Sequence, residues 1–306
     1  MLAIAYGPAP PDDPERFVLT ELERPRKLLA GPPRRIAAVT AATSKATAKA
    51  PRMTTASTFR SYASLLKLSH TVFALPFALA AVVLAAPFTE VTWRKLVLIV
   101  LCIAAARTAA MAFNRLVDRA YDAANPRTAR RELATGALSV VSVRALVAVS
   151  CALFVGAAAL LGTLPLLLSP LALALVLGYS YTKRFTWACH LILGVAVAFA
   201  PGGAWIAVGG PLDESAAPWL LVLGVATWIA GFDILYALQD RDFDIGVKLH
   251  SIPRRFGIRG GLLLSALLHV VTVASLVAVG VILERGSVYM LGVALIALLL
   301  VAEHAM

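Results

Sequence analysis

The sequence predicts an all-α, polytopic membrane protein, and three observations support this fold class. Of the 306 residues, 60% are hydrophobic and 15% are charged, with a mean hydropathy of +0.82. Soluble domains contain about 45–50% apolar and about 25% charged residues, so a single water-soluble domain is excluded. The apolar residues also occur in runs of about 20, the helical length that crosses a bilayer core. The ten-residue alternating segments of a membrane β-barrel do not occur.

Residues 1–55 differ in character from the rest of the chain. They are rich in Pro, Ala, Arg and Thr and show no apolar periodicity, so we expect a disordered tail. Met53 directly precedes the first ordered-looking segment. The interpretation that we favour is a gene start assigned too early, and the alternative is a genuine tail. Residues 56–306 are expected to form the membrane domain.

Eight apolar spans can be drawn after this tail. They cover residues 69–87, 95–113, 143–162, 164–181, 187–208, 217–237, 261–283 and 287–302. Only the short stretch from Gly162 to Pro165 joins the third span to the fourth. This connection predicts a tight helical hairpin.

The distribution of Lys and Arg predicts how the spans are oriented. Thirteen of these residues lie in the loops after spans 2, 4 and 6, against three on the opposite side, Arg94, Lys95 and Arg285. Because Lys and Arg concentrate in cytoplasmic loops, we expect these three loops to face the cytoplasm. The net charge of +11 therefore indicates topology and anionic ligands. It does not indicate nucleic acid, because a basic groove with interleaved aromatic residues is absent.

The end of the second span carries a polar ladder, which we call the first aspartate motif. It consists of Asn114, Asp118 and Asp122, spaced four residues apart. On a continuous helix this spacing stacks the three side chains along one face. The motif therefore predicts a column of oxygen atoms at the membrane surface.

The end of the sixth span repeats this spacing with Tyr236, Asp240 and Asp244, which we call the second aspartate motif. Asp233 lies one turn deeper, within the apolar span. An acid at that depth is costly and by default functional. The alternative for Asp233 is a structural acid that is hydrogen-bonded to Tyr236 or to an adjacent helix.

Stacked carboxylates repel one another and cost helix stability, and divalent cations are the simplest way to offset this repulsion. Mg²⁺ prefers hard oxygen ligands and usually binds through one or two carboxylates plus substrate phosphates. Two facing motifs therefore predict two Mg²⁺ ions with a diphosphate between them. The alternative is that the acids are solvated helix ends paired with neighbouring Arg residues. Two motifs of identical spacing at cytoplasmic span ends argue against it.

A diphosphate also requires cations. Lys183 follows the fourth span among hydroxyl and aromatic side chains, including Tyr181, and is expected to contact phosphate, whereas Arg184 is equally well explained as a topology marker. Arg127 and Arg131 follow the first motif four residues apart. The guanidinium fork of Arg suits bidentate recognition of phosphate.

Two further residues are assigned less directly. Arg115 is expected either to bind the diphosphate or, with Arg119, to pair with the acids of the first motif. His70 belongs to a polar patch ahead of Phe73, where it is either structural or a substrate contact. The sequence contains no P-loop, dinucleotide-binding, zinc-protease or nucleophile-elbow motif. Functions that depend on those motifs are therefore unsupported.

These motifs resemble the UbiA superfamily of membrane prenyltransferases. The matching strings are NRLVDRAYDAANPRT (114–128), YSYTKRFT (179–186) and DILYALQDRDFD (233–244), and the resemblance covers about residues 60–306. The flanking strings LHSIPRRFG (249–257) and KLSHTVFALPFA (67–78) resemble a bacterial branch of 4-hydroxybenzoate polyprenyltransferase-like proteins. Part of that branch is associated with menaquinone made through futalosine.

The resemblance implies a nine-helix bundle with a central cavity open to the lipid bilayer, in a bacterial inner membrane. It implies Mg²⁺-dependent transfer of a polyprenyl group from an isoprenyl diphosphate to an aromatic acceptor, such as 4-hydroxybenzoate or a dihydroxynaphthoate, for respiratory quinones. The resemblance implies three sets of roles. Lys183 and Arg127 contact the diphosphate, and Asp233 orients or deprotonates the acceptor. The residues that bind the metal and the diphosphate are Asn114, Asp118, Asp122, Asp240 and Asp244. Tyr236 and Tyr181 are expected to be further substrate contacts.

The sequence departs from the family pattern in two places. Glu132 stands where Pro is usual, and only eight spans fit before Met306, so we expect the ninth helix to be missing. One alternative function is a cation-coupled transporter, which would require acids at the membrane midplane and broken helices. Others are a UbiA-family enzyme with another acceptor, such as haem, and an alcohol phosphotransferase, whose D-x-x-D-G-x-x-A-R string is absent.

Overall fold

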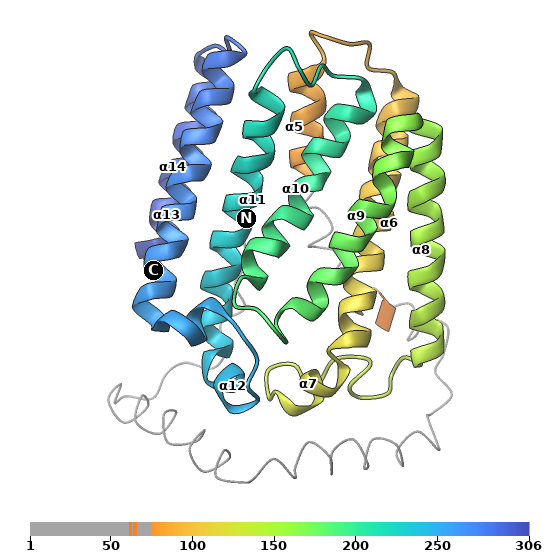
Figure 1. Ribbon diagram of the computed structural model, residues 1–306, viewed down its shortest axis with the longest axis vertical. Coiled ribbons are helices and arrows are strands. Elements are labelled where there is room, and N and C mark those ends of the chain that lie inside the picture. Colours follow the sequence, from red (N-terminus) through yellow and green to blue (C-terminus); the bar gives the residue numbers. More distant parts are fainter. Residues whose placement is uncertain (1–60, 63, 66–74, 306) are drawn as a thin grey trace. The chain divides into compact units, whose positions relative to one another are not determined.

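The computed structural model describes residues 61–62, 64–65 and 75–305, all within one compact unit of residues 50–306. The predictions made for residues 1–55 and for His70 lie outside these residues. The described part is a bundle of helices (Figure 1). Its helices are α5 (Leu75–Ala85), α6 (Trp93–Val117), α7 (Arg119–Ala124), α8 (Val140–Leu161), α9 (Thr163–Thr182), α10 (Cys189–Val208), α11 (Ala217–Ala237), the 3₁₀ helix η1 (Leu238–Asp240), α12 (Arg241–Gly246), α13 (Ile252–Ile282) and α14 (Ser287–Ala305).

The prediction of a polytopic membrane protein is confirmed. Seven helical segments among the described residues are long and apolar enough to cross a membrane. The predicted first span, residues 69–87, is described only from residue 75, where α5 has 11 residues. Each of the other seven predicted spans corresponds to one of the long helices.

The largest difference from a predicted boundary is at α13, which begins at Ile252 instead of residue 261. The side chain of Ser251 caps this helix by accepting a hydrogen bond from the backbone of Arg254. Gly257 then interrupts the helical geometry with a φ of 73°, a conformation that favours glycine. The basic residues of this first segment lower its hydropathy, which is why hydropathy did not detect it.

The predicted hairpin between the third and fourth spans is confirmed. Gly162 alone separates α8 from α9 and has a φ of 140°, which a side chain would disfavour. Its backbone N–H donates to the carbonyl of Ala158 and closes the end of α8. The two helices are therefore joined without a loop.

The prediction of continuous helices through both aspartate motifs is wrong. Helix α6 ends at Val117 and α7 begins at Arg119, so Asp118 is a junction with φ −91° and ψ 6°. Asp240 has nearly the same conformation, φ −99° and ψ 2°, where η1 meets α12. Both lie in the bridge region of backbone space. A straight helix would stack the carboxylates of each motif, and the break lets each of them face a different cation. The two short helices α7 and α12 lie at the same end of the bundle (Figure 1).

Candidate active site

Ion pairs join the second aspartate motif to the loop that follows α7. Asp240 accepts hydrogen bonds from two nitrogens of Arg127, and Nε lies 2.9 Å from its Oδ1. The amide of Asn125 donates to the same oxygen at 3.2 Å. The hydroxyl of Tyr236 accepts a hydrogen bond from Arg127 at 3.1 Å, and the guanidinium lies over the Tyr236 ring. Arg127 therefore binds two members of the second motif at once.

The loop after α9 contacts both motifs. The Nζ atom of Lys183 lies 3.3 Å from the carboxylate of Asp244, which is 1% exposed. The next residue, Arg184, donates to the backbone carbonyl of Val117 at 2.7 Å and lies 3.6 Å from Asp118. This loop therefore supplies one cation to each motif.

Asp122 is neutralised from within the first half of the chain. Its carboxylate accepts a hydrogen bond from Arg131 at 2.6 Å, and Arg115 lies 3.9 Å away. For Arg115 this is the acid-pairing alternative of the sequence analysis. Arg131 had been predicted to bind diphosphate, and here it holds a carboxylate.

The charge states follow from these pairs. Burial, with repulsion from Asp122 as the next cause, raises the pKa of Asp118 to about 6. Burial, the largest single cause, would lower the pKa of Lys183, but Asp244 and the other nearby acidic groups together outweigh it, and the pKa is raised. The hydrogen bond to Asp240 raises the pKa of Arg127. Of these groups, the Asp118 carboxylate has the least compensated charge.

The oxygen donors of the two motifs fit a hard divalent cation. The amide nitrogen of Asn114 donates to Asp118 at 3.0 Å, which leaves the amide oxygen of Asn114 available. Oδ2 of Asp244 is buried and, apart from its ion pair with Lys183, has no hydrogen-bond partner among the described residues. No three Asp, Glu, His or Cys side chains of the described segments are grouped as a metal site. The assignment of the motifs to Mg²⁺ stays a prediction.

Asp233 is hydrogen-bonded to an adjacent helix, as its structural alternative anticipated. Its Oδ2 atom lies 2.7 Å from Nδ1 of His190 on α10. His190 is 1% exposed, and its Nε2 is buried without a hydrogen-bond partner among the described residues. The Asp233 side chain is 31% exposed, so it remains accessible to a substrate.

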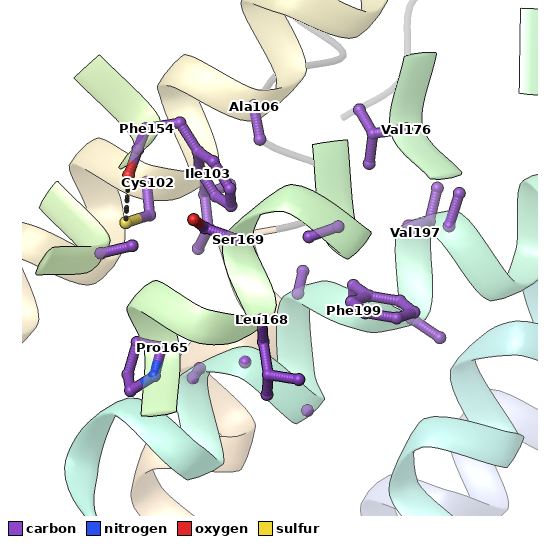
Figure 2. Close-up of a pocket in the computed structure, with 18 of the residues that line it drawn as sticks. Cys102, Ile103, Ala106, Phe154, Pro165, Leu168, Ser169, Val176, Val197 and Phe199 are labelled. Carbon is purple, nitrogen blue, oxygen red and sulfur yellow. Dashed lines mark hydrogen bonds between the residues drawn. The ribbon is translucent and has the colours of Figure 1, made fainter. Parts of the chain in front are cut away.

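An apolar cavity of about 400 Å³ lies within the bundle, lined by residues of α6, α8, α9, α10 and α11. Figure 2 shows Cys102 and Ile103 of α6, Leu168 and Ser169 of α9, and Phe199 of α10 around it. Tyr179 and Arg107 also line the cavity. Met111, three residues before Asn114, is a further lining residue, and Tyr179 lies four residues before Lys183. The cavity therefore reaches the region of the aspartate motifs.

Tyr181, which the sequence analysis assigned to substrate, lies beside this region. Its ring packs edge-on against Phe113 at a centroid distance of 5.9 Å, and the guanidinium of Arg184 lies over it. With Phe113 and Arg144 it lines a second pocket of about 270 Å³.

Comparison with known proteins decides the family. Residues 74–306 match the UbiA prenyltransferase family. The chain belongs to this family. The predicted resemblance is therefore confirmed, and the protein is a prenyltransferase.

Named relatives and solved structures agree with this assignment. The chain is 36% identical over 218 residues to a 4-hydroxybenzoate octaprenyltransferase of Nitrosomonas eutropha, covering 69% of this chain and 73% of that protein. It is 31% identical to one of Aliivibrio salmonicida, over 66% and 70% of the two chains. The apo structure of a UbiA homologue from Aeropyrum pernix K1 is 37% identical with a TM-score of 0.73, over 78% and 88% of the chains. A UbiA homologue from Archaeoglobus fulgidus bound to GPP and Mg²⁺ is 20% identical with a TM-score of 0.65, over 80% and 86%, and shows the shared fold.

Sequence reasoning assigned no role to two residues of this prenyltransferase, His190 and Arg107. His190 was noted as a neighbour of the basic loop, and only the structure brings it to Asp233. Arg107 could have been found, because a charge within an apolar span is by default functional, the argument that singled out Asp233. It lies in the middle of α6.

Proposed function

We propose that this enzyme transfers a polyprenyl group from an isoprenyl diphosphate to an aromatic acceptor, 4-hydroxybenzoate or a dihydroxynaphthoate, for respiratory quinone biosynthesis. The observation that carries the proposal is the set of four cation-paired aspartates at the end of a bundle with an apolar interior cavity. Polar groups for a diphosphate and an apolar volume for its tail are thereby adjacent. The names of the 4-hydroxybenzoate octaprenyltransferases that the chain resembles support the choice of acceptor.

The basic residues of the three loops serve the diphosphate in this proposal. Arg127, Arg131, Arg115 and Lys183 each hold an aspartate in the structure and exchange that carboxylate for phosphate oxygens when substrate binds. Mg²⁺, held by Asn114, Asp118, Asp122, Asp240 and Asp244, supplies Lewis-acid stabilisation of the leaving diphosphate. Because each cation is already next to an anion, the exchange preserves the charge balance of the site.

The reaction breaks the bond between the prenyl C1 and the diphosphate oxygen and forms a carbon–carbon bond to the aromatic ring, which then loses a proton. We propose that Asp233 accepts this proton. Its hydrogen bond to His190 holds the carboxylate in position, and its partial exposure leaves an oxygen for the acceptor. The apolar lining of the cavity excludes water from the allylic cation.

The orientation in the membrane follows from the same loops. We propose that the loops after α6, α9 and α11 face the cytoplasm of a bacterial inner membrane, because thirteen Lys and Arg residues lie on this side and three on the other. Labelling of single cysteines at positions 183, 242 and 94 in intact and opened cells tests this orientation, because the side chain of Asp242 is exposed. Protection of 183 and 242 together in intact cells, with 94 accessible, is expected. Positions 183 and 242 on opposite sides would contradict it.

The test of the function is a transfer assay. Membranes that contain the enzyme are incubated with Mg²⁺, a radiolabelled polyprenyl diphosphate and a panel of acceptors that includes phenolic acids, naphthoic acids and haem. Membranes with Asp240→Asn are treated in the same way. Prenylated 4-hydroxybenzoate or dihydroxynaphthoate that forms with the wild type and not with the variant supports the proposal. Transfer only to haem-type acceptors, or release of diphosphate with no prenylated product, would overturn it.

A further inference from the structure

We infer that the second pocket binds an anionic phospholipid, with the head-group phosphate at Arg144 and an acyl chain against the apolar lining. The inference goes beyond the proposed function and does not rest on it, because a phospholipid is not a substrate of that reaction. The pocket has a volume of about 270 Å³. Its described lining residues come from α6, α8 and α9 and are Phe113, Leu116, Val117, Arg144, Val147 and Tyr181.

The second pocket lies on a different side of α6 from the central cavity. None of its described lining residues also lines that cavity. Met111 faces the central cavity, and Phe113 follows it by two residues. Because an α-helix turns about 100° per residue, Phe113 lies on roughly the opposite side of the helix. Leu116 and Val117, three and four residues later, share its face. A ligand in the second pocket therefore does not compete with one in the central cavity.

The pocket lies close to the helix ends, at the level where lipid head groups are found. Val117 is the last residue of α6, and Tyr181 is the last but one of α9. Arg144 lies four residues after the first residue of α8, Val140, about 6 Å along the helix. These three helix ends lie at the end of the bundle that carries α7 (Figure 1). Arg and Tyr at this depth reach the head groups with their polar ends while their apolar parts stay in the hydrocarbon layer.

Arg144 supplies the charge that an anionic head group requires. It is the only charged residue of α8, it is exposed, and it makes no hydrogen bond, ion pair or ring contact with any described residue. The basic residues around the aspartate motifs differ from it, because each of them already lies beside a carboxylate. Basic pockets between spanning helices bind anionic lipid head groups. A free phosphate would leave the apolar lining uncovered, whereas the acyl chain of a phospholipid covers it.

The wall that Tyr181 contributes is held in place by its neighbours. Its ring packs edge-on against Phe113 and lies beneath the guanidinium of Arg184, which is itself hydrogen-bonded to the carbonyl of Val117. The Tyr181 side chain is nevertheless 42% exposed, so part of it is free to contact a ligand. A wall that is already ordered reduces the entropy cost of binding. The structure therefore combines a preformed apolar surface with an unpaired cation.

The inference is tested by direct binding of lipid to the full chain in a mild detergent, without any substrate of the transfer reaction. Native mass spectrometry measures binding of dioleoylphosphatidylglycerol, which is anionic, and of zwitterionic dioleoylphosphatidylcholine. The variants are Arg144→Gln, Val147→Phe, which fills the apolar part of the pocket, and the control Arg130→Gln. Arg130 is also exposed and lines neither pocket.

The wild type should bind phosphatidylglycerol about fivefold more tightly than phosphatidylcholine, the contribution of one basic residue at a membrane surface. For Arg144→Gln we expect the dissociation constant of phosphatidylglycerol to rise about tenfold, the loss of one charged hydrogen bond, and the preference for the anionic lipid to disappear. Val147→Phe should weaken phosphatidylglycerol by a similar factor, and Arg130→Gln should match the wild type.

Photo-crosslinking locates the lipid on the wild-type chain and so does not depend on the folding of a variant. Phosphatidylglycerol with a diazirine near the head-group end of one acyl chain should label peptides that contain residues 113–117, 144–147 or 181. An excess of sn-glycerol 3-phosphate should not displace it. Labelling confined to other parts of the bundle, displacement by sn-glycerol 3-phosphate, equal binding of the two lipids by the wild type, unchanged binding in Val147→Phe, or an Arg144→Gln variant that matches Arg130→Gln would each overturn the inference.

Discussion

Both aspartate motifs turn the backbone in the same way, but their carboxylates are neutralised from different places. Asp118 and Asp240 share a bridge-region conformation at the end of a spanning segment. In the second motif both aspartates take their cations from other loops, Arg127 and Lys183. In the first motif Asp122 takes Arg131 from its own loop. The geometry of the second motif therefore depends on all three loops, whereas the first is partly self-sufficient.

A second difference lies one to two turns deeper. The helix of the first motif carries Arg107, and the helix of the second carries Asp233. The two helices therefore carry like charges near the bundle end and opposite charges within the bundle.

The largest effect is expected from the aspartates that the motifs share. We expect Asp118→Asn and Asp240→Asn each to lower kcat by about 10³-fold, because each removes an anionic oxygen ligand of the Mg²⁺ that would stabilise the leaving diphosphate. Initial rates of transfer at saturating substrates measure this loss. A variant of either residue with more than half of the wild-type rate would break the equivalence of the two motifs.

The next effect concerns Asp233. We expect Asp233→Asn to lower transfer by about 100-fold, the usual range for loss of a general base, with binding of the prenyl diphosphate unchanged. Product formation and binding of a radiolabelled prenyl diphosphate are compared in the same preparation. An equal loss of both would assign Asp233 to the structure of the site or to metal binding.

A smaller effect is expected when the basic residue paired with each motif is removed, and its size should differ between the two motifs. Arg127→Met removes the guanidinium that pairs with Asp240. Arg131→Met also removes a cation, but Asp122 still has Arg115 nearby. We expect the KM for the prenyl diphosphate to rise about 30-fold for the first variant and about threefold for the second, since a charged hydrogen bond contributes about 1.5–3 kcal/mol. Steady-state kinetics at saturating acceptor measure the KM. Equal increases would show that the first motif is no more self-sufficient than the second.

The last effect is on stability. In the segment of residues 217–246, 50% of the apolar stretch is buried inside the protein, whereas in α6 only 22% of the corresponding stretch is buried. The helix that carries the second motif is therefore the more tightly packed of the two. A Cβ on Gly194 of α10 would lie 2.2 Å from the carbonyl oxygen of Ala226. Gly194→Ala should therefore destabilise the fold by about 2 kcal/mol, seen as a lower midpoint of thermal unfolding in detergent. The control is Gly156→Ala on α8, where nothing lies within 4 Å. An unchanged midpoint for Gly194→Ala would show that α10 and α11 adapt.

The sequence alone predicted most of the spanning helices, because a bilayer requires about 20 apolar residues per span. It missed the start of α13, where basic residues hide the helix. It also missed the breaks at Asp118 and Asp240, because four-residue spacing shows which residues share a face only if the helix continues. Arg127 and Asp240, which form an ion pair, are separated by 113 positions in the sequence, and the hydrogen-bonded His190 and Asp233 are separated by 43. No local pattern encodes such contacts.

The most direct test of the central claim, that both motifs hold one diphosphate through Mg²⁺, is a double-mutant cycle on binding. The dissociation constant of a non-hydrolysable prenyl thiodiphosphate is measured in nanodiscs against Mg²⁺ concentration for the wild type, Asp118→Asn, Asp240→Asn and the double variant. If one ligand spans both motifs, each single variant removes most of the Mg²⁺-dependent affinity, and the double variant is much less than additive. Affinity that is unchanged in EDTA, or losses that simply add, would contradict it.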